Sequence, residues 1–140
     1  MSVQAVLAPV FALVLLAFVL LFWMGRERFA AIRAGEVKTA EGSPRGFGWR
    51  GRAQQVSDCF HHQLELPVFF YVCVTLALVT KAADLVFVVL SWVFVALRVL
   101  HAVEHTGPNR IKRRFQLFLA GALVLMALWT WLALKVFTVL

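Results

Sequence analysis

The sequence predicts an all-α integral membrane protein, a bundle of four transmembrane helices. Of its 140 residues 62% are hydrophobic, whereas soluble domains contain roughly 45–50% apolar residues. The apolar residues form four runs, each with about the 20 residues that a helix needs to cross a hydrocarbon core of about 30 Å. The runs do not alternate between polar and apolar residues, as barrel strands do. Because backbone groups in lipid must bond within their own segment, we expect helices.

The bounds of the helices follow from these runs. We expect helices over about 3–24, 60–80, 83–106 and 116–140, in one domain that covers residues 1–140. No basic residue precedes the first run, so it is predicted to stay as a helix rather than act as a cleavable signal. The stretch "GRERFAAIRAG" after it has the pattern of a continued helix that stops at Gly35. "TGPN" at 106–109 ends the third helix, because glycine and proline interrupt helices.

The distribution of positive charge predicts the topology. The net charge is +7, and the basic residues gather in the segments 25–57 and 110–114. The positive-inside rule places both segments in the cytoplasm, so both termini are expected on the non-cytoplasmic side. Topology accounts for these charges, and we expect no nucleic-acid partner. The basic residues of the predicted cytoplasmic loop 25–57 are Arg26, Arg28, Arg33, Lys38, Arg45, Arg50 and Arg52.

Several kinds of chemistry lack the residues they need. The two cysteines, Cys59 and Cys73, would lie about 21 Å apart on one helix, too far for a disulfide. They do not form a CxxC pair, and the sequence has no P-loop, dinucleotide-binding glycine pattern or Ser–His–Asp arrangement. We therefore expect no metal site of the cysteine type.

Polar residues inside the predicted spans concentrate on the second helix. His61 and Glu65 are four residues apart and would share a helical face. Pro67 removes a backbone donor and can kink the helix open. Glu65 is interpreted in two ways: as an interfacial carboxylate favoured by the helix dipole, or as a carboxylate directed into a cleft.

A second group of polar residues ends the third helix. At 100° per residue Arg98, His101 and His105 fall within about 60° of one another, with Glu104 about 60° further round. Ionisable groups within spans are costly and usually face a bundle interior. We predict that they meet Glu65 in the assembled bundle; the alternative is that they extend to the cytoplasmic interface.

The stretch "HAVEH" also matches the H-x-x-E-H pattern of a class of zinc peptidases. Two histidines four apart can chelate zinc, with the glutamate as a base. A third ligand would have to come from His61, His62 or Glu65, since neither a histidine nor a glutamate follows His105. A five-residue match arises readily by chance, so we assign no metal ligands.

Taken together, these stretches resemble the MAPEG family, the membrane-associated proteins in eicosanoid and glutathione metabolism. "LELPVFFYV" looks like the second-helix motif of bacterial members, and "RVLHAVEHTGPNRIKRR" is similar to the corresponding stretch of microsomal prostaglandin E synthase. The layout covers the whole chain, whereas the specific likeness is confined to about 57–72 and 96–115. The resemblance implies a homotrimer of four-helix bundles in a bacterial inner (plasma) membrane, with sites between subunits near the cytoplasmic helix ends.

The resemblance also implies a glutathione- or thiol-dependent transferase or peroxidase that acts on lipophilic substrates. Arg114 would then be the catalytic residue, because an arginine favours the reactive thiolate. Residues expected to hold glutathione are Glu65, Arg98, His101, His105 and His61.

Two departures from the family pattern favour an alternative function. Members that use glutathione carry an asparagine shortly before the glutamate, where this chain has His61 or His62, and a tyrosine where it has His105. The alternative is a non-catalytic membrane protein, either an accessory subunit of a larger membrane complex or a scaffold that binds lipid or pigment. A transporter is a third option, but the sequence has no pair of broken helices. In every case membrane lipids are partners.

Overall fold

The computed structural model describes residues 1–35 and 48–138. These residues form five helices, namely α1 (Val3–Arg33), α2 (Gly51–His62), α3 (Leu66–Val79), α4 (Leu85–Thr106) and α5 (Ile111–Thr138). Four segments are long and apolar enough to cross a membrane, and α2 and α3 together make one of them, Gly51–Val79. The chain is an integral membrane protein.

Helix covers more of the chain than the four apolar runs do. α1 ends at Arg33, just before Gly35, whose φ of 72° is a left-handed conformation that suits glycine. α2 and α5 begin earlier than the runs at 60 and 116, because polar turns precede the apolar part of each helix. Much of the segment 25–57 is therefore helical rather than a loop. Lys38 and Arg45 of that segment, and the last two residues of the run 116–140, lie outside the described residues.

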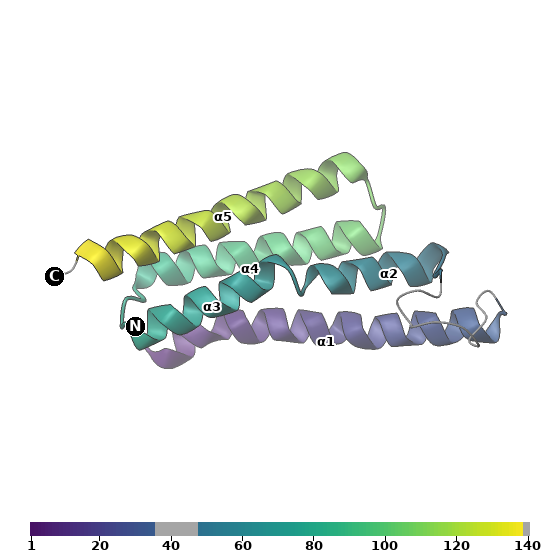
Figure 1. Cartoon of the computed structure of the whole chain (residues 1–140), viewed down its shortest axis with the longest axis horizontal. Helices are drawn as coiled ribbons and strands as arrows, with labels where there is room; N and C mark the ends of the chain where they lie inside the picture. The colour runs from purple at the N-terminus through teal and green to yellow at the C-terminus, as the bar shows by residue number, and fades with distance from the viewer. Residues whose placement is uncertain (36–47, 139–140) are drawn as a thin grey trace.

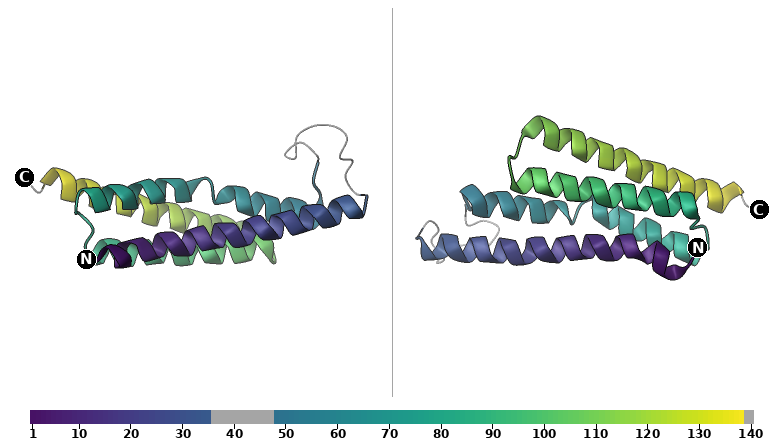
Figure 2. Two further views of the ribbon diagram at one scale, coloured as in Figure 1. Left: turned by 90° about the horizontal axis from the view of Figure 1, so that it is seen from below. Right: turned by 180° about the vertical axis from the view of Figure 1, so that it is seen from behind.

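The four spans lie side by side in alternating directions (Figure 1). α1 contacts α2, α3 and α4, and α5 packs against α4 and α3. The two turned views show the same elongated bundle, with both termini at one end (Figure 2). The α4–α5 turn, the C-terminal end of α1 and the start of α2 lie towards the opposite end. We call these the terminal end and the polar end.

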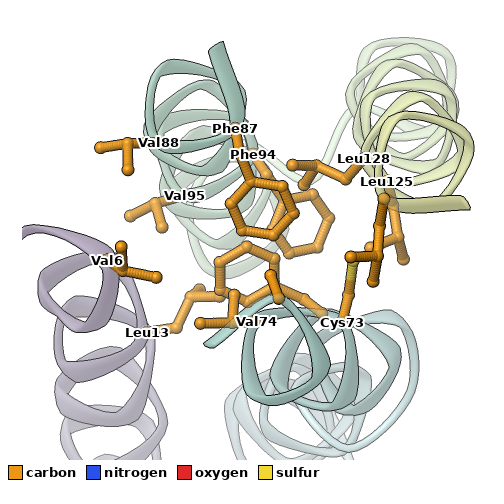
Figure 3. Packing of buried hydrophobic residues seen from close by; sticks show 13 residues of the cluster. Val6, Leu13, Cys73, Val74, Phe87, Val88, Phe94, Val95, Leu125 and Leu128 are labelled. Carbon is orange, nitrogen blue, oxygen red and sulfur yellow. The ribbon is translucent and has the colours of Figure 1, made fainter. Parts of the chain in front are cut away.

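The apolar core lies towards the terminal end, where all four spans contribute side chains (Figure 3). Phe70 of α3 stacks on Phe94 of α4 with ring centroids 4.9 Å apart, and Leu13 and Leu128 close the core from α1 and α5. Large apolar side chains such as Phe11, Phe22 and Phe69 are exposed on the outer surface. In a protein with four spans, these are the side chains that contact lipid.

The second span is interrupted between α2 and α3. α2 ends at His62, and α3 begins at Leu66 with Pro67 in its first turn. Proline has no N–H to donate to the carbonyl four residues earlier, and its ring disfavours helix in the residues before it. The chain turns at 63–65, and Glu65 adopts φ −100° and ψ −106°. The predicted kink is a complete break, so His61 and Glu65 do not share a face of one helix.

Candidate functional site

Arg98 on α4 carries a deeply buried guanidinium, with the residue 1% exposed. Its Nη2 donates to the carbonyl of His62 at 3.2 Å, a group exposed by the break between α2 and α3. Gly121 on α5 faces the stem of Arg98, and a Cβ there would lie 4.0 Å from Arg98 Cδ. Arg98 Nε has no hydrogen-bond partner among the described residues. A buried cation therefore joins the break to α4 and keeps one donor unused.

Three histidines gather beside Arg98. The ring centroids of His62, His101 and His105 lie 5.2 to 5.7 Å apart, and Phe118 of α5 covers the His62 and His101 rings. His101 and His105 are buried, and within the described part of the chain the Nδ1 atom of each is unpaired. The predicted stripe of Arg98, His101 and His105 faces the bundle interior.

Gln63 belongs to this group, and the sequence reasoning missed it. Its side chain is 2% exposed, and neither polar atom of its carboxamide is paired with a described residue. The antiparallel register of α2 and α4 places Gln63 level with Arg98, because Cys59 lies opposite Ala102 and Arg98 bonds to His62. The sequence could have indicated it through its four-residue spacing from Cys59, because residues four apart lie on the same face of a predicted helix.

Glu65 and His61 lie at the edge of the group. Glu65 Oε2 is 3.0 Å from His62 Nδ1, and the Glu65 side chain is 57% exposed. His61 points its Nδ1 to the carbonyl of Ser57 at 2.7 Å, and its ring contacts Phe60. The structure thus brings Glu65 to the histidines through His62. His61 thus contacts Ser57 and Phe60 of its own helix, α2.

Arg114 is held by the α4–α5 turn. Its Nη1 donates to Asn109 Oδ1 at 2.7 Å, and Asn109 adopts a left-handed φ of 52°. The backbone N–H of Asn109 bonds to the carbonyl of Glu104 at 2.7 Å. Arg114 lies close enough to His101 and His105 for its charge to act on both rings.

The α4–α5 turn is in turn fixed by α2. Gln55 Nε2 donates to the carbonyls of His105 and Gly107, at 2.7 and 3.1 Å, and Arg52 donates to the carbonyl of Thr106. These carbonyls lie at the C-terminal end of α4, where no N–H group of the helix donates to them. Gly107 also has to be small, because a Cβ would lie 2.8 Å from the carbonyl oxygen of Val103. One polar framework therefore sets the positions of His105 and Arg114.

Comparison with known proteins identifies the chain. The family model of the MAPEG family matches residues 6–134. The chain belongs to the MAPEG family. The resemblance drawn from the sequence is thus confirmed, and the family includes glutathione transferases and peroxidases. Neither a curated protein nor a solved structure matches the chain.

In this MAPEG protein Glu104 has a structural partner rather than a place beside the histidines. Arg110 donates to Glu104 from its backbone N–H at 3.2 Å and from Nε at 2.9 Å, and Arg113 lies 3.8 Å away. These bonds raise the pKa of Arg110, which lies in the turn. Across residues 1–35 and 48–138, no three His, Cys, Asp or Glu side chains are arranged to hold a metal ion. The residues of "HAVEH" form the last turns of α4.

The site of this MAPEG protein is therefore a polar group within a span, with two unlike sides. On the buried side, Gln63, Arg98, His101 and His105 present unpaired polar atoms. On the open side, His62 Nδ1 lies 3.0 Å from Glu65 Oε2, and the Glu65 side chain is exposed. Such a group can bind a small polar molecule that carries both anionic and hydrogen-bonding groups.

Proposed function

We propose that this MAPEG protein is a glutathione- or thiol-dependent transferase or peroxidase that acts on lipophilic substrates. The observation that carries the proposal is the buried Arg98 with the unpaired nitrogens of His101 and His105 beside it. Unpaired polar groups buried in a protein cost about 1–3 kcal/mol each. Several such unpaired groups lie together here, and a bound polar ligand would supply their missing hydrogen-bond partners.

The residues present fit glutathione. Arg98 Nε and the two histidine Nδ1 atoms can pair with the carboxylates and amides of a short peptide. When bound, glutathione supplies a nucleophilic thiol. We assign Arg114 to stabilise the thiolate, because a nearby guanidinium favours the ionised sulfur. Glu65, Arg98, His101 and His105 would hold the molecule, and His61 would contribute its Nε2 from the edge of the group.

The proposal extends to assembly and location. We propose a homotrimer in a bacterial inner membrane, with both termini on the non-cytoplasmic side. The basic residues at the polar end, including Arg26, Arg50 and Arg110, support that orientation. The open side of the site, at His62 and Glu65, would then face a neighbouring subunit. Cross-linking in membranes should give a ladder that stops at the trimer.

The test uses the purified full chain in detergent. Isothermal titration measures glutathione binding, and chloride release from chlorodinitrobenzene or loss of a lipophilic hydroperoxide measures turnover. We expect Arg114→Met to lower turnover more than affinity, with Lys112→Met as the matched control on the same turn of α5. Wild-type protein that neither binds glutathione nor turns over either probe would overturn the proposal.

A non-catalytic role is the second candidate. It is favoured by histidines where glutathione users have asparagine and tyrosine, and by the pairing of Glu65 with His62. An accessory subunit of a larger membrane complex would co-purify with its partners in constant ratio. A lipid- or pigment-binding scaffold would carry its ligand through purification. Thiol turnover by the isolated chain would exclude both.

A further inference from the structure

We propose that Gln63 recognises the peptide part of the thiol substrate, an inference that rests on the proposed function. Gln63 is the C-cap of α2, directly after its last residue, and its backbone N–H donates to the carbonyl of Phe60 at 2.9 Å. Its backbone is therefore satisfied. Its carboxamide is not, since both Oε1 and Nε2 are buried and unpaired among the described residues.

The position of Gln63 ties it to the site rather than to the apolar core. It lies level with Arg98 across the antiparallel pair of α2 and α4, next to His62, whose ring contacts His101 and His105. Gln63, Arg98, His101 and His105 each have at least one polar atom without a partner inside the described protein. A single unpaired amide is a local cost, whereas four neighbouring residues with unpaired atoms form a recognition surface.

The chemistry of a carboxamide limits what Gln63 can bind. It offers one acceptor and two donors in a plane, with no charge. An extended peptide residue presents its own N–H and C=O on one side, and a carboxamide can bond to both. Arg98 and Arg114 suit carboxylates and a thiolate, so Gln63 adds selection for an amide-containing skeleton. Gln63 would therefore let the site distinguish a thiol that carries peptide bonds from a simple alkyl thiol.

Gln63 lies in the break between α2 and α3, two residues from the exposed Glu65. Residues 63–65 are not part of either helix. A change in the conformation of this short segment could therefore expose the carboxamide without unfolding α2 or α3.

The experiment compares two thiols on three forms of the full chain in detergent. Glutathione carries peptide bonds and mercaptoethanol does not. The forms are wild type, Gln63→Met and the control Gln54→Met, which replaces a carboxamide on the same helix that is already paired with Asp58 at 2.6 Å. We expect Gln63→Met to raise the Kd for glutathione by about 10- to 100-fold, the net effect of two hydrogen bonds. Its turnover of mercaptoethanol should fall much less than its turnover of glutathione, and Gln54→Met should change neither.

Thermal stability supplies a second measurement. Because methionine removes unpaired buried polar atoms, Gln63→Met should melt at the same temperature as wild type or higher. A lower melting temperature would mean that the carboxamide stabilises the free protein, and would overturn the inference. So would unchanged glutathione affinity, or equal loss with both thiols. Wild-type protein that binds glutathione while Gln63→Met binds it equally well refutes this inference alone; wild type that binds no thiol refutes the proposed function as well.

Discussion

The two ends of the bundle differ in how far their polar side chains are paired. At the terminal end Asp84 accepts from the backbone N–H of Phe87 at 2.9 Å, from Trp131 Nε1 at 3.1 Å and from Lys135 Nζ at 3.0 Å. One carboxylate thus begins α4 and joins it to α5, with its bonds made. At the polar end Gln63, Arg98, His101 and His105 are buried with polar atoms left over. A satisfied cluster stabilises a fold, whereas an unsatisfied one is available to bind.

Arg98→Met should have the largest effect. It removes the buried cation that bonds to His62 and faces the proposed ligand. Loss of about two charge-assisted hydrogen bonds corresponds to at least a 100-fold drop in glutathione affinity. Stability should fall by about 1–3 kcal/mol, because the His62 carbonyl loses the donor that Arg98 supplies. Lys135→Met is the matched control, because it removes a cation at the terminal end. Equal affinity in the two variants would break the comparison.

Asp84→Ala should show the reverse pattern. It removes an N-cap, a bond to the Trp131 indole and a partly exposed ion pair with Lys135, which together contribute about 2 kcal/mol. We expect a lower melting temperature in detergent and unchanged thiol binding. Reduced thiol binding without a lower melting temperature would contradict the assignment of the binding site to the polar end.

Asn109→Gly sharpens the comparison within the polar end. Glycine accepts the left-handed φ of 52° but lacks the Oδ1 that accepts from Arg114. Arg114 would lose one charge-assisted bond, and we expect turnover to fall about tenfold, with smaller changes in KM. Asn109→Asp retains the acceptor and should recover most of the rate. If Asn109→Gly and wild type have the same rate constant, Asn109 does not position Arg114.

The acid sensitivity of the terminal end is the smallest expected effect. Burial raises the pKa of Asp84, but bonds from Phe87, Lys135 and Trp131 outweigh it, and the net pKa is below the ordinary value of 3.8. The stabilisation is therefore complete above pH 3.8 and is lost as the pH falls through the folded value. Melting temperatures of wild type and Asp84→Asn should converge below that pH. A constant difference across the acid range would contradict this assignment.

Much of the fold followed from simple patterns. Four apolar runs predicted four spans because lipid demands continuous apolar helices. The spacing of Arg98, His101 and His105 predicted one buried stripe, since a helix brings residues three and four apart onto one face. The break at 63–65 was predicted only as a kink, because the effect of Pro67 depends on which donors lie near the carbonyls before it. Here Arg98 donates to the carbonyl of His62.

The sequence by itself determined the membrane class, the number of spans and the family, because hydropathy and short motifs are local properties of the chain. Only the tertiary structure decided which polar groups meet. It joined Glu104 to Arg110 instead of to the histidines, and it buried Gln63 level with Arg98. The position of Gln63 depends on the register between α2 and α4, which are distant in sequence, and no local pattern encodes that register. Glu104 and Arg110 are only six residues apart, but they meet because of the way the α4–α5 turn folds.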